Sequence, residues 1–323
     1  MQRIPGSEAT NSDTWSAVDV GDLTGRVALV TGANSGIGYE VTRVLAEHGA
    51  HVLMACRNQE KAARARDKLE SQLSRSSLEL VDLDLSDLAS VRAAAGRVLD
   101  QHARLDLLVN NAGVMGTPSL QTADGFELQM ATNHLGHFAL TGLLLDRLVT
   151  TERSRIVTVS SHMHRLGRVR PDDVAGAKAR NPWLVYSTSK LANLLFVAEL
   201  SRRLEAGGFR TAALAAHPGW TRSNLAGSGG ALSGSRVRRR LSRAVGSNLG
   251  QSAAGGALPV LCASTAANVR NGQYIGPAGA FGMYGPPRLA RPSRRARDLS
   301  MAARLWAASE ELTGVRYSVG ASV

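Results

Sequence analysis

Short apolar runs recur along the chain, separated by stretches of mixed polarity. Each run is rich in Val, Leu or Ala and almost continuously apolar, which is typical of parallel strands covered by helices on both faces. The runs lie at residues 26–31, 51–56, 78–83, 105–110, 155–160, 211–216 and 272–276. We therefore expect a mostly parallel sheet of seven strands.

The segments between these runs carry helical periodicity. In GIGYEVTRVLAEHGA, Ile37, Val41 and Val44 fall on one stripe, and a glycine follows the last turn. Alternating strands and helices with right-handed crossovers give a doubly wound, Rossmann-type sheet with helices on both faces. We predict a single α/β domain over residues 24–323, preceded by a flexible N-terminal arm over residues 1–23.

Residues 223–250 depart from this alternation. They join Gly- and Ser-rich stretches to a short arginine-rich run, in which Val237, Leu241 and Val245 recur every four residues. Loops that close over a site often have small residues at their hinges, and this spacing would give a short helix one apolar face. We interpret the segment as a candidate substrate lid with an apolar inner face; a surface loop is the alternative.

The composition of the chain is that of a folded globular protein, with 44% hydrophobic and 20% charged residues among 323. No apolar run approaches the roughly 20 residues that cross a bilayer, and the first residues lack the apolar centre of a secretion signal. The two cysteines, Cys56 and Cys262, have no CxxC spacing, which argues against a disulfide framework or a zinc site. We expect a cytoplasmic protein without a bound metal.

The formal net charge of +12 comes mainly from arginine, which is concentrated at residues 235–243 and 288–297. Such runs can meet nucleic acid or an anionic membrane surface. Neither run alternates with aromatic residues or lies in a nucleic-acid-binding motif, so we expect a solvated basic surface and no specific nucleic acid partner. Peripheral membrane contact stays open, and the sequence does not indicate an oligomeric state.

The segment TGANSGIG follows the first strand directly and opens the first helix. Gly32 permits a tight turn, whereas Gly36 and Gly38 let the backbone approach a pyrophosphate at the helix N-terminus. A structural turn without a ligand is the alternative. The strand before the loop and the helix after it favour a dinucleotide site.

The end of the second strand reads MACRN. An NAD site commonly has a carboxylate near this position, about 20 residues after the glycine loop, to bind the ribose hydroxyls. Here Arg57 stands at the strand end, and a guanidinium suits the additional 2′-phosphate of NADP. The residue indicates NADP(H) as the cofactor, with an ordinary surface arginine as the alternative.

In VYSTSK, Tyr186 and Lys190 are four residues apart just before an apolar helical run, so their side chains leave one helix face. A solvated helix face is one interpretation. The other is an acid–base pair, in which the ammonium favours the phenolate and lowers the pKa of the phenol from its usual value of about 10.

The glycine loop and VYSTSK are accompanied by four further motifs: NNAG (110–113), TNHLGHF (132–138), VSS (159–161) and HPGW (217–220). Together the six motifs lie in the order and spacing of a known family. Over about residues 24–276 the chain resembles the short-chain dehydrogenase/reductases. The segments MACRN, TNHLGHFALT and RLWAASEELTG resemble the branch that contains retinol dehydrogenases and light-dependent protochlorophyllide reductases.

The resemblance implies a catalytic tetrad of Asn133, Ser161, Tyr186 and Lys190. Ser161 is preferred to its neighbour Ser160, because the second serine of such a pair faces the substrate in the family. By resemblance, Asn133 bends its helix and holds a water that passes a proton to Lys190. The residues expected to contact the cofactor are Gly32, Asn34, Ser35, Gly36, Ile37, Gly38, Arg57, Asp84, Leu85, Asn111, Ala112, Gly113, Tyr186, Lys190, Pro218, Gly219 and Thr221.

We therefore expect an NADP(H)-dependent oxidoreductase that transfers a hydride between nicotinamide and a lipophilic carbonyl or alcohol. The alternatives are a tetrapyrrole double-bond reductase of the protochlorophyllide reductase type and a protein that senses NADP(H) without turnover. His134 and His137 could share a helix face, but the sequence shows no third ligand, so we assign them no metal. His162 and His164 follow the serine pair and are candidates to line the pocket.

Overall fold

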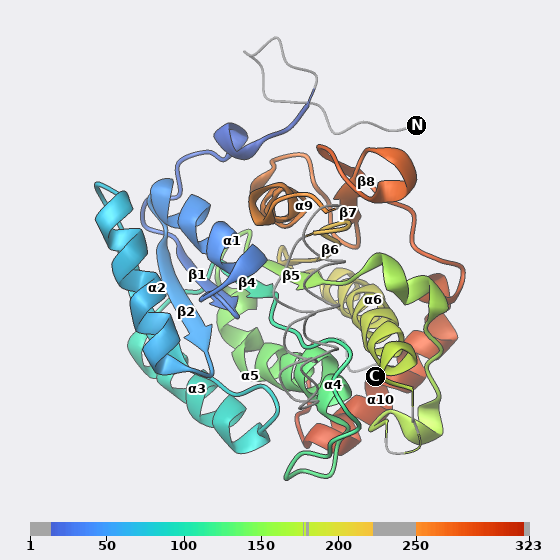
Figure 1. Cartoon of the computed structure of the whole chain (residues 1–323). Helices are drawn as coiled ribbons and strands as arrows, with labels where there is room; N and C mark the ends of the chain where they lie inside the picture. The colour runs from blue at the N-terminus through green and yellow to red at the C-terminus, as the bar shows by residue number, and fades with distance from the viewer. Residues whose placement is uncertain (1–13, 177, 179–180, 222–249, 320–323) are drawn as a thin grey trace.

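The computed structural model describes residues 14–176, 178, 181–221 and 250–319. Within these residues one eight-stranded sheet has the strand order β3-β2-β1-β4-β5-β6-β7-β8. The strands are β1 (Val27–Thr31), β2 (His51–Cys56), β3 (Ser77–Asp82), β4 (Leu107–Asn110), β5 (Arg155–Val159), β6 (Ala212–Ala216), β7 (Tyr274–Pro277) and β8 (Pro287–Leu289). The predicted doubly wound α/β fold is confirmed (Figure 1).

The prediction of seven strands missed the edge strand β8. This strand pairs antiparallel with β7, matching Ile275 with Leu289 and Pro277 with Pro287. It has three residues and begins with proline, so it lacks the apolar run by which the other strands were found. The other seven strands pair in parallel.

Helices cover both faces of the sheet (Figure 1). One face is covered by α1 (Gly36–Glu47), α2 (Gln59–Gln72) and α9 (Ala253–Thr265). The other is covered by α3 (Leu88–Gln101), α5 (Gly136–Thr150) and α6 (Pro182–Ala206), and α10 (Leu299–Thr313) packs against α6 and α5. The short elements are η1 (Ala17–Asp19), α4 (Leu128–Met130), η2 (Ala131–Leu135), η3 (His162–Leu166), η4 (Pro171–Asp173), η5 (Ala280–Gly282) and η6 (Arg295–Arg297).

Side-chain alternation along β2 explains why the protein has a core on each side of the sheet. Val52 and Met54 belong to the cluster beneath α1 and α9, whereas Leu53 and Ala55 belong to the cluster beneath α3 and α5. Successive residues of a strand face opposite sides, so a continuously apolar strand supplies both cores.

The flexible arm expected over residues 1–23 is corrected for its second half. Trp15 and Val20 are buried in the core cluster of α1 and α9, with exposures of 6% and 3%. Between them lies η1, whose Ser16 N–H donates to the carboxylate of Asp19 over 2.7 Å. Burying an indole ring removes a large apolar surface from water, which fixes this segment on the domain.

The structure does not test the candidate lid or the first part of the N-terminal arm. The candidate lid at 223–250 lies outside the described residues except for Gly250, and residues 1–13 of the arm also lie outside them. Among the residues that are described, no helix has the length and apolarity needed to cross a membrane.

Candidate active site

The site lies at the carboxyl ends of the parallel strands, where the strand order reverses between β1 and β4. In open α/β sheets this switch point is where ligands bind. In the β1–α1 loop Gly32 and Gly36 have φ angles of +68° and +56°, which favour glycine. Among the described atoms, none lies within 4 Å of where a Cβ of Gly36 would be, so the loop leaves room for a ligand above it.

Gly38, in the first turn of α1, serves a different purpose. A Cβ at this position would collide with the carbonyl oxygen of Gly32 and lie 2.5 Å from Nδ2 of Asn111. The missing side chain therefore lets helix α1 pack tightly against its own loop. Ser35 precedes α1, and within the described structure its side chain makes no capping hydrogen bond to the first turn. An anion can thus take the place of a cap at this N-terminus.

Thr31, the last residue of β1, joins the glycine loop to the segment after β4. Its Oγ1 accepts hydrogen bonds from the backbone N–H groups of Asn111 and Ala112, each over 2.9 Å. Asn111 Nδ2 donates in return to the Thr31 carbonyl over 2.8 Å. The two segments expected beneath the dinucleotide are therefore held together before any ligand binds.

Arg57 and Asp84 meet at the carboxyl ends of β2 and β3. An Nη1 atom of Arg57 lies 3.8 Å from Oδ2 of Asp84, and the arginine side chain is 65% exposed. The other carboxylate oxygen of Asp84 accepts from the N–H and the hydroxyl of Ser86, over 2.9 and 2.6 Å. Asp84 is thus fixed, whereas the guanidinium fork of Arg57 remains open to a ligand.

Tyr186 and Lys190 lie in the first turns of α6, which begins after the capping residue Asn181. Both side chains belong to buried residues, with exposures of 5% and 4%. Nζ of Lys190 lies 5.8 Å from the centroid of the Tyr186 ring and donates to the carbonyl of Val159 over 3.0 Å. The arrangement excludes the solvated helix face that was the alternative for this motif.

Burial acts on the two ionisable groups in opposite directions. It raises the pKa of the Tyr186 phenol, an effect that the hydrogen bond with Ser161 opposes. It lowers the pKa of Lys190 to about 8. The expected lowering of the phenol pKa by Lys190 stays a prediction: burial is the largest cause acting on this pKa and raises it, and Nζ of Lys190 donates to the carbonyl of Val159.

The two adjacent serines face different partners. Ser160 is buried, and its hydroxyl donates to the carbonyl of Lys190 over 2.8 Å. Ser161 forms the hydrogen bond with the Tyr186 phenol, and its Oγ also accepts from the N–H of Met163 over 3.2 Å. The structure therefore places Ser161, rather than Ser160, beside the phenol.

Asn133 lies in η2, a π-helical turn between α4 and α5. Such turns widen a helix by one residue and are frequent at functional sites. The amide group of Asn133 exchanges two hydrogen bonds with the backbone of Val114, over 2.8 and 3.0 Å, and also donates to Ser189 Oγ over 2.9 Å. A Cβ on Gly113 would lie 3.1 Å from Oδ1 of Asn133 and 3.4 Å from Nζ of Lys190, so this glycine keeps the two side chains close.

His137 is a residue whose part in this site the sequence did not indicate. Its Nδ1 lies 3.1 Å from the carbonyl oxygen of Asn133, and its Nε2 lies 2.9 Å from Oγ1 of Thr31. Because a carbonyl only accepts, Nδ1 carries the proton and Thr31 donates to Nε2. The ring thus links the glycine loop to the π-helical turn.

His134 points away from His137, toward α10, where its Nε2 lies 3.0 Å from Ser309 Oγ. Burial lowers the pKa of His134 to about 4 and that of His137 to about 3. Both rings are therefore neutral and bound within the core. The two rings have different partners, Ser309 for His134 and Thr31 for His137, and among the described residues they belong to no cluster that could hold a metal ion.

The HPGW turn follows β6. Gly219 has a φ of +70°, and a Cβ there would collide with the carbonyl oxygen of Met283. The carbonyl of Pro218 accepts from Gln251 Nε2 over 2.5 Å, and Thr221 forms a parallel bridge with Gln251. Pro218 and Thr221, which precede the candidate lid, are therefore hydrogen-bonded or bridged to Gln251, which follows it.

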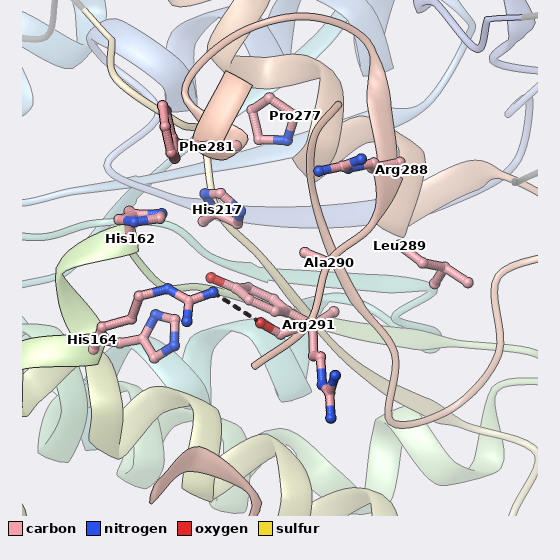
Figure 2. A pocket seen from close by; sticks show the side chains of 12 residues that line it. His162, His164, His217, Pro277, Phe281, Arg288, Leu289, Ala290 and Arg291 are labelled. Atoms are coloured by element: carbon pink, nitrogen blue, oxygen red, sulfur yellow. Dashed lines mark hydrogen bonds between the residues drawn. The ribbon is translucent and has the colours of Figure 1, made fainter. Parts of the chain in front are cut away.

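A pocket of about 470 Å³ opens between this turn and η3 (Figure 2). His162 and His164 line it, and the ring centroids of His162 and His217 lie 6.2 Å apart. The described lining also contains three arginines and no carboxylate, and Arg165 donates to the carbonyl of Arg291 over 3.2 Å (Figure 2). Because burial lowers the pKa of all three histidines, the positive charge of the pocket comes from the arginines.

The comparisons with known proteins agree with this geometry. Residues 26–230 match the family model described as short chain dehydrogenase. The chain belongs to the short-chain dehydrogenase family. The predicted resemblance is thereby confirmed, including the retinol dehydrogenase-like branch.

Individual relatives of this short-chain dehydrogenase differ in how much of the chain they match. Human retinol dehydrogenase 11 is 46% identical over 203 residues, which cover 63% of this chain and 63% of the human protein. The chain thus matches less than two thirds of that relative's length. A crystal structure of an uncharacterized protein from Mycobacterium Paratuberculosis has a TM-score of 0.77 and 42% identity, covering 94% of this chain and 99% of that one.

A third similar protein was solved with a cofactor. It is a short chain dehydrogenase from Shigella flexneri 2a str. 301 complexed with NADP. Its TM-score is 0.58 and its identity 25%, with 78% of this chain and 96% of that chain covered.

Proposed function

We propose that this short-chain dehydrogenase is an NADP(H)-dependent oxidoreductase that interconverts a carbonyl and an alcohol. The observation that carries the proposal is the convergence of Ser161, Tyr186, Lys190 and Asn133 beside the glycine loop. An oxidoreductase of this family needs a nicotinamide cofactor, which supplies or accepts the hydride. The chain itself has to hold that cofactor and to move one proton.

Tyr186 is the proposed acid–base residue. Because burial favours its neutral form, the phenol carries the proton that a substrate oxygen requires during carbonyl reduction. Ser161 is bound to the phenol and is placed to hold the same substrate oxygen by a hydrogen bond. During alcohol oxidation Tyr186 takes the proton back.

Lys190 is the proposed proton relay behind Tyr186. A group with a pKa of about 8 exchanges protons readily near neutral pH. Asn133 holds the neighbouring backbone in place through Val114, and because Gly113 has no side chain, no Cβ fills the space that lies 3.1 Å from Oδ1 of Asn133 and 3.4 Å from Nζ of Lys190. We propose that this space admits the water expected from the family resemblance.

Three features of the chain fit NADP(H). The loop leaves open space above Gly36, helix α1 begins without a side-chain cap from Ser35, and the exposed guanidinium of Arg57 stands at the end of β2. A 2′-phosphate would meet the arginine fork in a bidentate arrangement. The NADP complex of the Shigella flexneri relative supports this choice.

We further propose that the substrate has a lipophilic body. Large apolar side chains are exposed on segments that border the site: Leu166 in η3, Trp183 at the start of α6 and Trp220 in the HPGW turn, with exposures of 63%, 51% and 52%. Phe281 at the pocket is 88% exposed. Exposed apolar side chains on the segments that carry a site are typical of a surface that binds apolar ligands. The names of the retinol dehydrogenase relatives support the same class of substrate.

Cofactor titration tests the proposal at Arg57. Isothermal titration calorimetry should show NADPH bound at least tenfold more tightly than NADH by the wild-type protein. Arg57→Asp should remove this preference by weakening NADPH selectively, since its carboxylate repels the 2′-phosphate. Arg64→Asp is the matched control, because Arg64 is an exposed arginine on α2 with the same change of charge. Equal affinities in the wild type, or an equal loss in both variants, would contradict the role of Arg57.

A further inference from the structure

Two histidines and a glutamate meet at the opposite end of the sheet from the proposed active site. His51 begins β2, Glu79 lies in β3, and His102 follows the last residue of α3. Nε2 of His51 lies 3.2 Å from Oε2 of Glu79, and Nε2 of His102 lies 3.3 Å from the same oxygen. One potential ligand atom from each residue lies within 4.8 Å of the other two.

The parallel register explains why these residues meet. His51 pairs with Ser77 and Leu53 pairs with Glu79 on the neighbouring strand. His51 and Leu53 face the same side of β2, and Leu53 belongs to the core cluster beneath α3 and α5. Helix α3 covers this face and ends at Gln101. His102, the next residue, therefore lies above the first residues of β2 and β3.

Two of the three separations match those of ligands around a divalent metal ion, and the third, between the two nitrogen atoms, is at most 4.8 Å. Bonds of about 2.0–2.1 Å at tetrahedral angles place neighbouring ligand atoms roughly 3.3–3.4 Å apart. The two nitrogen-to-oxygen distances, 3.2 and 3.3 Å, lie close to that value. Two imidazoles and a carboxylate form a ligand set that suits Zn²⁺ and related first-row ions and leaves a fourth position for water.

Further contacts orient the side chain of His51 and fix the backbone of His102. Because the Glu79 carboxylate only accepts, Nε2 of the neutral His51 ring donates to it over 3.2 Å and Ser77 Oγ donates to Nδ1 over 2.6 Å; ligation of an ion through Nε2 would move the proton to Nδ1, where Ser77 Oγ can accept it. Nε2 of His102 is shielded from solvent and makes no hydrogen bond within the described structure, despite its closeness to Glu79. Arg147 donates to the carbonyls of His102 and Leu99 and so fixes the end of α3.

We propose that His51, Glu79 and His102 form a binding site for a divalent first-row metal ion such as Zn²⁺. The ion ties β2, β3 and the end of α3 together, and it takes no part in the proposed hydride transfer. The sequence led us to expect no metal, because the three ligands lie 23 or more positions apart without a recognisable motif. The site is independent of the proposed function.

Metal titration of the tag-free protein tests the proposal. At pH 7.5, after treatment with a chelator, the wild type should bind one equivalent of Zn²⁺ with a dissociation constant below about 10 µM in calorimetry. At 100 µM Zn²⁺ its thermal midpoint should rise by about 2 °C or more, since an ion that binds only the folded state stabilises it. Co²⁺ should give visible absorption bands of a four- or five-coordinate site.

The variants decide which residues bind the ion. His51→Gln, Glu79→Gln and His102→Gln should each weaken Zn²⁺ binding at least tenfold and abolish the thermal shift. His48→Gln, which removes a histidine outside the trio, should retain both. Circular dichroism and NADPH binding show whether each variant is folded. Absence of a Zn²⁺ equivalent in the wild type, or binding that survives all three substitutions, would leave only a hydrogen-bonded cluster and overturn the proposal.

Discussion

Burial of Tyr186 and Lys190 favours the neutral form of each side chain. It raises the pKa of the phenol and lowers that of the amine, while Ser161 and Val159 supply hydrogen bonds that hold the two groups in place. A neutral phenol beside a substrate site is a proton donor, which is the form that carbonyl reduction uses. The buried lysine is costly to the folded state, and this cost can be measured.

Tyr186→Phe separates proton transfer from binding. The substitution keeps the ring in its buried position but removes the transferable proton and the partner of Ser161. We expect the turnover number to fall by roughly 10²-fold or more, with NADPH affinity changed by less than about threefold. Steady-state kinetics and calorimetry on the same preparation measure both. Retention of more than a tenth of wild-type turnover would remove Tyr186 from its proposed role.

Lys190→Met should stabilise the protein while it impairs turnover. A pKa lowered to about 8 means that the charged lysine opposes folding at neutral pH. The cost is on the order of 3 kcal/mol below pH 8 and disappears as the pH rises from about 8 toward the unfolded value near 10.4, where the folded state has already lost the proton.

Urea unfolding measures this effect of Lys190→Met. The free energy of unfolding should rise by about 1–3 kcal/mol at pH 7, and the gain over wild type should shrink by pH 10. Lys61→Met is the control, because this lysine is exposed on α2 and should change stability by less than about 0.5 kcal/mol. A destabilised Lys190→Met protein at pH 7 would contradict the account of the buried charge.

Two elements shape the site through the backbone rather than through side-chain chemistry. The loop before α1 depends on close packing at Gly38, and the π-helical turn η2 directs Asn133 toward Val114 and Gly113. His137 and Thr31 connect these elements by hydrogen bonds. The cofactor loop and the proposed proton relay are therefore parts of one rigid arrangement.

Gly38→Ala tests the close packing of the loop. The new methyl group would collide with the Gly32 carbonyl and with Asn111, so the loop must shift. We expect NADPH affinity to fall at least tenfold. Gly96→Ala in α3 is the matched control, because no described atom lies within 4 Å of its Cβ position and alanine favours a helix by about 1 kcal/mol. If both variants bound NADPH like the wild type, the packing argument would fail.

The elements differ in how far the sequence could predict them. Continuous apolar runs marked β1 to β7, since burial on both faces requires such runs, but β8 is too short and too rich in proline to carry that signal. The motif around Tyr186 predicted the helix face correctly, because local spacing fixes it. The family resemblance, rather than any 3.6-residue period, predicted a bend at Asn133, and the structure has a π-helical turn there. The contacts of His137 carried no sequence signal, because they join segments that are distant in the chain.

At the scale of the whole molecule, prediction fails where distant segments meet. Trp15 is an isolated aromatic residue in a polar stretch, and only the packed structure shows that it is buried against the core. The arginines of the pocket come from η3 and from the chain around β8, more than 100 residues apart, and the His51–Glu79–His102 cluster depends on strand register. Contacts between residues that are distant in the sequence depend on tertiary packing, and the local pattern of apolar and polar residues does not predict them.

The sheet places the proposed active site at the carboxyl ends of its strands and the proposed metal site at their amino ends. The central claim concerns the first of these: the protein transfers hydride from NADPH to a carbonyl carbon. The most direct measurement uses NADPH that carries deuterium at both C4 positions, with a panel of lipophilic aldehydes and ketones, and mass spectrometry of the products. The account predicts alcohols with one deuterium on the carbinol carbon, formed by the wild type and at least a hundredfold more slowly by Tyr186→Phe. Wild-type protein that binds NADPH yet transfers no deuterium to any member of the panel would contradict it.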